Sequence, residues 1–322
     1  MNFVKRLYKK LFNSDNQSES RMSKAYLKRY LESAFTEGDC KNIQQYEACI
    51  TRLYHTIEKG LAYLEYRPGF GRDNVKKLVD ILYKYVETYD KQTFFYQTAL
   101  SVLHEYVKKN KEYGYSNEEQ EKRINSLSGA PNTSGGILAF TPLTTEELRS
   151  ANFETLILNR HSIRHFSDIP VSLEKIKKAL ALAQHTPSAC NRQGWRTRII
   201  SNKKKIEAVL KNQNGNRGFG QEFDKLLVVT SDLRYFNRER ELFQGYIDGG
   251  MYAMNLLNGL YYEGIGSVPL SASLSEVQEE SVRKILNIDN AEILILFIGV
   301  GNYPDICQTT KSERKDVEFI EL

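Results

Sequence analysis

A stretch without large apolar side chains, residues 128–136, divides this chain into two parts with different hydrophobic periodicity. Its sequence is Ser-Gly-Ala-Pro-Asn-Thr-Ser-Gly-Gly, and Pro142 follows shortly after it. Such a composition neither packs against a core nor sustains a helix. We therefore predict a linker at residues 128–143, with one domain at 1–127 and a second at 144–322. The length of 322 residues fits two domains, and 41% hydrophobic residues are enough to form their cores.

The first domain is predicted to be helical throughout. Apolar residues recur at helical spacing over residues 24–35, 43–64, 73–89 and 93–110. The chain contains 20 tyrosines, and many of them lie in this part at the same spacing. They are better explained as an amphipathic packing surface than as platforms for stacking nucleic-acid bases.

Residues 1–12 predict a short basic amphipathic helix. One side carries Phe3, Val4, Leu7, Tyr8, Leu11 and Phe12, and the other carries Lys5, Arg6, Lys9 and Lys10. A helix of this kind can bind an anionic membrane surface. The same pattern suits a helix that docks on its own domain or one that frays, so peripheral membrane contact is one of three interpretations.

Two segments of the helical part carry unusual residues. His55 and Glu58 are three positions apart, so they would share one face of a helix. That spacing suits a metal site or a proton relay, and it equally suits an ordinary hydrogen bond. The turn at residues 67–71 places Arg67 and Arg72 where they can meet an anionic ligand, or it only connects two helices through glycines that permit positive φ.

Beyond the linker, helical and strand patterns alternate, which predicts an α+β fold. Thr144 and Glu147 fit a capping box at the start of a helix, and so do Ser275 and Gln278. Helices are predicted at residues 144–159, 172–184, 203–211 and 241–262, and strands at 195–201, 226–231 and 293–300.

Two motifs follow one another in this second part. The first is Arg160-His161-Ser162-Ile163-Arg164, and the second is Pro187-Ser188-Ala189-Cys190-Asn191-Arg192-Gln193-Gly194-Trp195. They resemble the R-x-S-x-R/K and P-S-x-x-N-x-Q-P-W elements of the FMN-dependent nitroreductase family, with Gly194 where that family usually has proline. The resemblance extends from about residue 147 to the end of the chain. It implies a mixed sheet wrapped by helices and a homodimer formed through long apolar helices, which residues 248–257 resemble.

The resemblance implies a site for the phosphate of FMN. That group carries close to two negative charges, which a bidentate guanidinium and a short hydroxyl donor satisfy with charge-assisted hydrogen bonds. Arg160 and Ser162 suit this task, and His161 is expected to flank the cofactor. Lys311 and Arg314 resemble the basic element with which the family closes over the same phosphate, and a solvated charged tail is the alternative.

The resemblance also implies contacts to the flavin ring. Arg164 matches the position that faces the N1/C2 carbonyl side, where reduction places negative charge. Asn191 and Gln193 are expected to bond ring and ribityl oxygens, and the family supplies their segment from the second subunit. The neighbouring residues expected beside the ring are Pro187, Ser188, Ala189, Pro269, Leu270 and Ser271.

Several classes of function are excluded. Lys and Arg number 45 against 40 Asp and Glu, and no basic tract alternates with aromatic residues, so no nucleic-acid partner is predicted. No apolar run is long enough to span a membrane, and no secretion signal is found. The four cysteines lack metal spacing and predict reduced thiols in a cytoplasmic protein. Residues 218–220, Gly-Phe-Gly, lack the context of a dinucleotide-binding motif, so a nicotinamide is expected to bind only transiently over the flavin.

The resemblance therefore implies an FMN-dependent oxidoreductase that passes hydride from NADH or NADPH through flavin N5 to a small organic acceptor. Two alternatives remain open. One is a flavin-modifying enzyme of the same superfamily, which fragments reduced FMN with oxygen. The other is a non-catalytic flavin-binding subunit whose helical domain recruits a partner.

Overall fold

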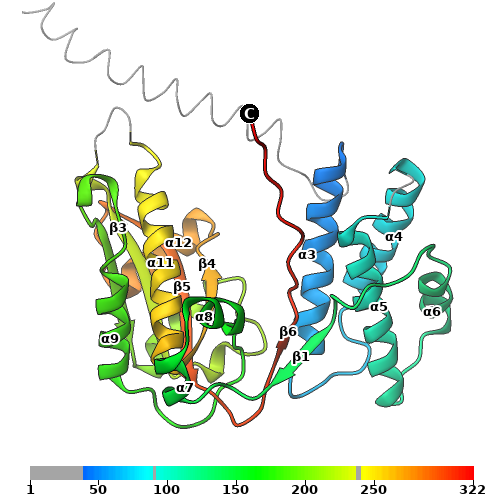
Figure 1. Cartoon of the computed structure of the whole chain (residues 1–322), viewed down its shortest axis with the longest axis horizontal. Helices are drawn as coiled ribbons and strands as arrows, with labels where there is room; N and C mark the ends of the chain where they lie inside the picture. The colour runs from blue at the N-terminus through cyan, green and yellow to red at the C-terminus, as the bar shows by residue number, and fades with distance from the viewer. Residues whose placement is uncertain (1–38, 90–91, 237–240) are drawn as a thin grey trace, which may run out of the picture. The chain divides into compact units, whose positions relative to one another are not determined.

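The computed structural model describes residues 39–89, 92–236 and 241–322, so the helices predicted at 1–12 and 24–35 lie outside the described residues. Contacts divide the described chain into two compact units (Figure 1). Residues 142–305 form one, called here the sheet unit. Residues up to 141, together with residues 306–322, form the other, called here the helical unit.

The helical unit is built on four named helices within the described residues: α3 (Ile43–Leu61), α4 (Arg72–Tyr89), α5 (Phe94–Glu112) and α6 (Glu118–Asn125). The side chain of Asn42 caps α3 by accepting from the Gln45 N–H, and Asn117 caps α6 in the same way. Apolar faces of α3, α4 and α5 and their tyrosines form one core. The predicted helices at 43–64, 73–89 and 93–110 are thus present within a few residues.

The turn at residues 67–71 connects α3 to α4 and is fixed by packing. A Cβ at Gly60 would lie 2.0 Å from the ring of Phe70, so only glycine allows this ring to rest on α3. Gly69 has φ +73 and its N–H donates to Asn110 Oδ1 at 2.6 Å. In the structure this turn acts as a helix connection, with Arg67 exposed.

A two-stranded antiparallel ribbon completes the helical unit. It pairs β1 (Ile137–Phe140) with β6 (Cys307–Thr310), and Ile137 lies opposite Thr310. The predicted linker therefore contains a strand, β1. Because β6 pairs with β1, residues 306–322 group with the helical unit. Glu58, fully buried, accepts from the Gly136 N–H at 3.0 Å and lies 3.4 Å from His55 Nδ1, so this pair anchors the ribbon to α3.

The sheet unit contains a sheet of four strands within its described residues, in the order β2 (Trp195–Ile200), β3 (Lys225–Asp232), β5 (Glu292–Asn302) and β4 (Ile265–Ser271). All three pairings are antiparallel, and a parallel bridge between Ser162 and Ser267 gives the sheet its mixed character. Strands β2, β3 and β5 were predicted. Strand β4 was not, because its glycines and proline are typical of a turn.

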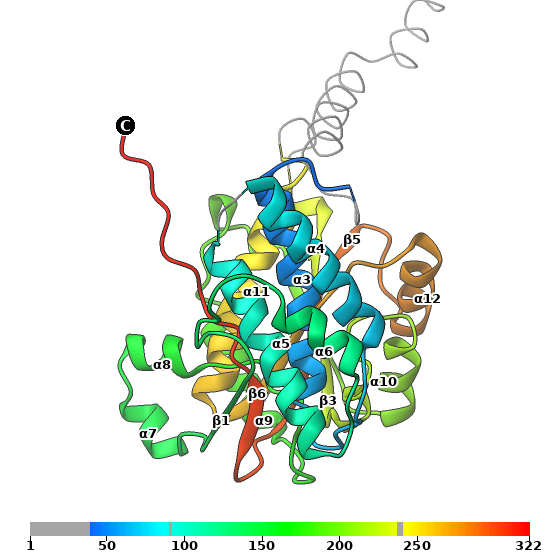
Figure 2. The ribbon, with the colours of Figure 1, turned by 90° about the vertical axis from the view of Figure 1, so that its right-hand side faces the viewer.

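Helices cover this sheet. The long helix α11 (Gln244–Tyr262) contacts all four strands and packs against α9 (Leu173–Ala183), while α10 (Lys203–Leu210) and α12 (Glu276–Leu286) pack on each other away from α11 (Figure 2). Both predicted capping boxes form, at α7 (Thr145–Ser150) and at α12. The single helix predicted at 144–159 is instead two, because Asn152 caps a new helix, α8 (Phe153–Asn159). The α+β fold with a helical N-terminal part is confirmed.

No helix among the described residues is both long and apolar enough to cross a membrane.

Candidate functional site

The segment after α8, residues 160–167, lies along the edge strand β4. The Ile163 N–H donates to the Ser267 carbonyl at 2.9 Å, and the Ser167 N–H donates to the Asn302 carbonyl at 3.0 Å. A Cβ at Gly301 would lie 2.5 Å from the ring of Phe166, so the ring can pack against β5 only because this residue is glycine. Backbone pairing and the packing of the partly buried Phe166 ring together fix the position of the first motif.

Two guanidinium groups and a hydroxyl group belong to this segment. Arg164 is 7% exposed, donates from Nη1 to the Ser162 carbonyl at 3.4 Å and lies 5.8 Å from the centre of the Phe219 ring. Arg160 Nη1 and Arg164 Nε are both buried. Burial raises the pKa of Tyr261 on α11, and the charge of nearby Arg160 opposes that rise. No carboxylate lies within residues 160–164, so the segment suits an anionic group such as a phosphate.

A carboxylate from a distant loop holds the same segment in place. Glu222 Oε1 lies 2.9 Å from His165 Nδ1, and its Oε2 accepts from the Phe166 N–H at 3.2 Å. Sequence reasoning missed Glu222, because no local spacing links it to a residue 57 positions earlier. Its role is to fix the chain immediately after Arg164.

The end of β4 borders the same loop. Gln213, 5% exposed, donates from Nε2 to the Ser271 carbonyl at 3.1 Å, and Asn216 donates to the Gln213 carbonyl at 2.5 Å. Leu270 is buried, Pro269 is partly buried and Ser271 is exposed. Because Phe219 of this loop lies under Arg164, one loop links the first motif to residues 269–271. Gln213 was another contact that the sequence did not reveal.

The distance along β4 from Ser267 to Ser271 gives the separation between the first motif and residues 269–271. Ser162 pairs beside Ser267, and Ser271 lies four residues further along the strand, which is about 13 Å at the usual rise of an extended chain. A ligand with an anionic head and a flat body can therefore extend along this edge. The structure brings Arg160, Ser162 and Arg164 onto the same strand edge as residues 269–271.

The second motif forms a loop at the start of β2. Cys190, Asn191 and Gln193 all have left-handed backbone conformations, with φ values of 51, 55 and 52. Pro187 and Asn191 are exposed, and Ser188, Ala189 and Gln193 are partly buried. Gln193 Nε2 donates to Asn191 Oδ1 at 3.1 Å, so the two predicted ring contacts lie side by side.

The sheet register separates this loop from the first motif. Ser267 pairs with Val300 at one end of β5, whereas Trp195 pairs with Ser231, which pairs with Ile293 near the other end. With β4 and β2 at opposite edges, the two motifs lie roughly 20 Å apart along the strands and roughly 15 Å apart across them. Within one copy of the chain they do not form a common site.

Lys311 and Arg314 belong to the helical unit. Lys311 donates from Nζ to the Thr133 carbonyl at 2.8 Å, and Arg314 donates to the Ser312 carbonyl. Their predicted contact with a phosphate stays a prediction.

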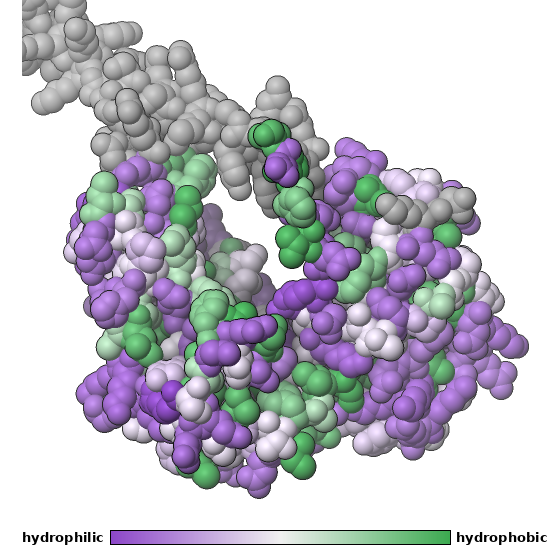
Figure 3. Space-filling model, viewed as in Figure 1, coloured by the Kyte–Doolittle hydropathy of each residue, from purple (hydrophilic) through white to green (hydrophobic). Residues whose placement is uncertain are grey.

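Helix α11 presents an apolar face to solvent. Tyr246 and Ile247 are just over half exposed, and Met251 and Met254 are each 43% exposed. Their spacing places them on one side of the helix, opposite the residues that pack on the sheet. Figure 3 shows hydrophobic and hydrophilic side chains mixed over the sheet unit.

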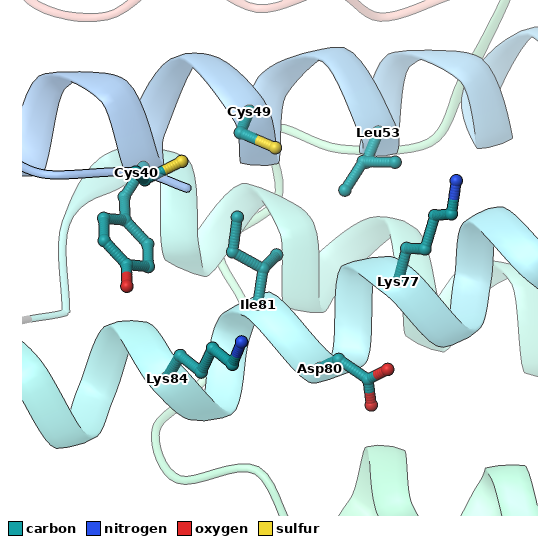
Figure 4. Close-up of a pocket in the computed structure, with 8 residues that line it drawn as sticks. Cys40, Cys49, Leu53, Lys77, Asp80, Ile81 and Lys84 are labelled. Carbon is teal, nitrogen blue, oxygen red and sulfur yellow. The ribbon is translucent and has the colours of Figure 1, made fainter. Parts of the chain in front are cut away.

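The helical unit has a cavity of about 440 Å³ between α3 and α4 (Figure 4). Cys49, Leu53 and Ile81 form its apolar walls, and Lys77 and Lys84 extend beside it. Asp80 also lines it and pairs with Arg123 at 2.6 Å. Among the described residues no cluster of three His, Cys, Asp or Glu side chains could hold a metal ion, there or elsewhere.

Comparison with known proteins points to one family. The family model described as "Nitroreductase family" matches residues 157–216 and 207–302. An Archaeoglobus fulgidus protein, provisionally named NADH dehydrogenase/NAD(P)H nitroreductase, is 28% identical over 152 residues, which are 46% of this chain and 83% of the relative.

Solved structures with the same kind of name are also similar. A Parabacteroides distasonis protein with the same provisional name is 23% identical, with a TM-score of 0.42 over 52% of this chain and 92% of the other. An FMN-dependent nitroreductase of Clostridium difficile is 18% identical, with a TM-score of 0.41 over 51% of this chain and 90% of the other.

Proposed function

The C-terminal half of this chain belongs to the nitroreductase family, and from that premise we propose that the protein is an FMN-dependent oxidoreductase. Bound FMN would supply the chemistry, by accepting hydride from NADH or NADPH at N5 and passing it to a small organic acceptor. The observation that carries the proposal is the edge of β4, where the buried Arg164, the partly buried Arg160 and the Ser162 hydroxyl lie along the same strand as residues 270–271.

The residues present fit FMN. Arg160 and Ser162 would hold the phosphate, since a guanidinium and a hydroxyl donate charge-assisted hydrogen bonds to it. Arg164 would face the N1/C2 side of the ring, where a fixed cation favours negative charge on the ring. Its contact with Phe219 and its bond to the Ser162 carbonyl hold the guanidinium in one orientation. Residues 269–271 would border the ring near N5.

The complete site needs two copies of the chain. Residues 187–193 lie at the corner of the sheet opposite the first motif, so Asn191 and Gln193 of a partner copy would complete each site. The exposed apolar face of α11 supports this homodimer, because its half-exposed tyrosine, isoleucine and methionines would be buried in the interface.

We place this activity in the cytoplasm, where reduced nicotinamides are supplied.

The test is the absorbance spectrum of the purified protein with added FMN, before and after anaerobic NADH or NADPH. We expect a bound flavin spectrum that bleaches on reduction and recovers when an electron-poor aromatic acceptor is added. A colourless protein that retains no FMN would contradict the proposal and favour a partner-recruiting role. Loss of flavin absorbance that requires oxygen and no acceptor would instead indicate a flavin-fragmenting enzyme.

A further inference from the structure

The loop at residues 188–193 holds an unusual backbone. Three of its residues, none of them glycine, occupy the left-handed region within four consecutive positions. L-residues adopt this conformation rarely, and it persists only where the surroundings impose it. The contacts that impose it here come from residues outside the predicted binding set.

A buried carboxylate fixes the start of the loop. Asp248 of α11 is 1% exposed, and its Oδ2 accepts from the Ala189 N–H at 3.1 Å. Its Oδ1 accepts from Gln244 Nε2 at 2.7 Å. Both carboxylate oxygens therefore have partners, and one of them is the loop backbone immediately before the left-handed residues.

An arginine clamps the middle of the loop. Arg192 donates from Nη1 and Nη2 to the two oxygens of Glu241 at 2.8 and 2.7 Å. Its Nε donates to the Ala189 carbonyl at 2.9 Å. Because one guanidinium makes all three hydrogen bonds, it ties the loop to Glu241, which lies just before α11.

Arg192 also lies over the ring of Phe236, which packs against Gly194 and Gly245. The guanidinium of Arg192 is 5.4 Å from the centre of the Phe236 ring. A Cβ at Gly194 would lie 3.1 Å from this ring, and one at Gly245 would lie 3.3 Å from it. Glycine at position 194 thus allows Phe236 to pack beneath the arginine.

The end of the loop is fixed to the sheet. Gln184 donates from Nε2 to Gln193 Oε1 at 2.7 Å and accepts from Trp195 Nε1 at 3.0 Å. Trp195 stacks on Tyr252 of α11 with ring centres 4.9 Å apart. This is the single tryptophan of the chain, so its fluorescence reports on the loop directly.

We propose that Arg192 and Asp248 are positioning residues that hold residues 188–193 in the conformation in which Asn191 and Gln193 meet FMN. Neither residue contacts the cofactor in this scheme. The inference rests on the proposed function, and its consequence is that the loop is organised before the cofactor binds. Preorganisation lowers the ordering cost of binding, so loss of the clamp should weaken FMN affinity.

The experiment compares Arg192→Ala with Arg149→Ala. Arg149 makes a closely similar contact at the other end of α11, pairing with Glu263 at 2.6 Å and lying 4.2 Å from the centre of the Tyr262 ring. For each protein the FMN dissociation constant is measured by flavin fluorescence, and the Trp195 emission is recorded without FMN. We expect Arg192→Ala to weaken FMN binding about tenfold and to shift the Trp195 emission, and Arg149→Ala to change neither.

Glu241→Gln provides a second variant that removes the ion pair with little change in shape, so it tests the clamp even if Arg192→Ala does not fold. It should shift FMN affinity and Trp195 emission in the same direction as Arg192→Ala. If both clamp variants bind FMN like the wild type, or no more weakly than Arg149→Ala, the positioning role is wrong while the proposed function stands. A wild-type protein that binds no FMN would overturn both.

Discussion

The two units of this protein bury polar groups in different ways. In the helical unit several tyrosine hydroxyls at or near the core donate to backbone carbonyls: Tyr83 to Arg123, Tyr96 to Ser128 and Tyr106 to Phe70. The first of these bonds joins α4 to α6, and the other two fasten α5 to connecting segments. Such neutral, locally satisfied groups hold a shape and do not need a ligand.

Most of the buried charged side chains among the described residues belong to the sheet unit, although Glu58 of the helical unit is also buried. Glu292 is 1% exposed and accepts from Arg196, Arg198 and Thr230, while Asp232 of the neighbouring strand accepts from Arg196 and Arg234. The three non-glycine residues with left-handed backbone conformation at positions 190, 191 and 193 also belong to this unit. Buried charge and imposed backbone conformation are typical of binding and catalytic regions. The comparison favours the sheet unit as the place of the proposed chemistry.

The largest loss of stability should come from removing the buried carboxylate of Glu292 in the sheet unit. Glu292→Ala leaves Arg196 and Arg198 without their shared partner, which we expect to lower the free energy of unfolding by about 3–5 kcal/mol. Urea unfolding followed by Trp195 fluorescence measures it. Asp80→Ala in the helical unit removes a partly exposed partner of Lys76 and Arg123 and should cost at most about 1 kcal/mol. Similar losses for the two variants would contradict the contrast between the units.

Cofactor binding offers a second test. Arg160→Ala should weaken FMN binding by about 2–3 kcal/mol, because a charge-assisted contact to the phosphate is lost. Arg67→Ala removes the exposed arginine of the turn between α3 and α4, and it should leave the dissociation constant unchanged. Equilibrium dialysis against FMN measures both. Full flavin occupancy in Arg160→Ala would refute the phosphate assignment, and a loss in Arg67→Ala would show that the helical unit takes part in binding.

Extremes of pH should destabilise the two units differently. The Arg198 hydrogen bonds hold the pKa of Glu292 down to about 2, so the stability this carboxylate contributes is present above its ordinary pKa and is lost as the pH falls from about 4.5 towards 2. Burial raises the pKa of Tyr85, Tyr96 and Tyr106. Their contribution is present below about pH 10 and is lost as the pH rises further.

We therefore expect acid to act first on the sheet unit and alkali first on the helical unit. Trp195 emission reports the sheet unit, and tyrosinate absorbance together with helical circular dichroism reports mainly the helical unit. Simultaneous loss of both signals at each extreme would show that the units unfold together.

Local features of this fold could be predicted from the sequence, and long-range ones could not. The capping boxes at Thr144 and Ser275 depend on residues three positions apart, and both were found. Strand β4 depends on its pairing with β5, and β1 depends on β6 about 170 residues away, so neither was recognised.

The candidate site shows the same division. The motif residues could be selected by type and spacing, but their supports could not: Glu222 contacts a residue 57 positions away, and Asp248 one 59 positions away. Nor does the spacing of the two motifs reveal that they lie at opposite corners of one sheet. That fact follows only from the strand order, which long-range pairing decides.

The smallest effect, and the finest comparison, comes from removing one hydroxyl in each unit. Tyr106→Phe loses the bond to the Phe70 carbonyl, and Tyr252→Phe loses the bond to Thr197 at 3.0 Å. Each should cost about 1 kcal/mol, the usual net value of one buried hydrogen bond. Because Tyr252 also stacks on Trp195, only its variant should alter Trp195 emission in the folded protein. A change in that emission caused by Tyr106→Phe would mean that the helical unit supports the loop at residues 188–193, and the division of roles between the units would then be wrong.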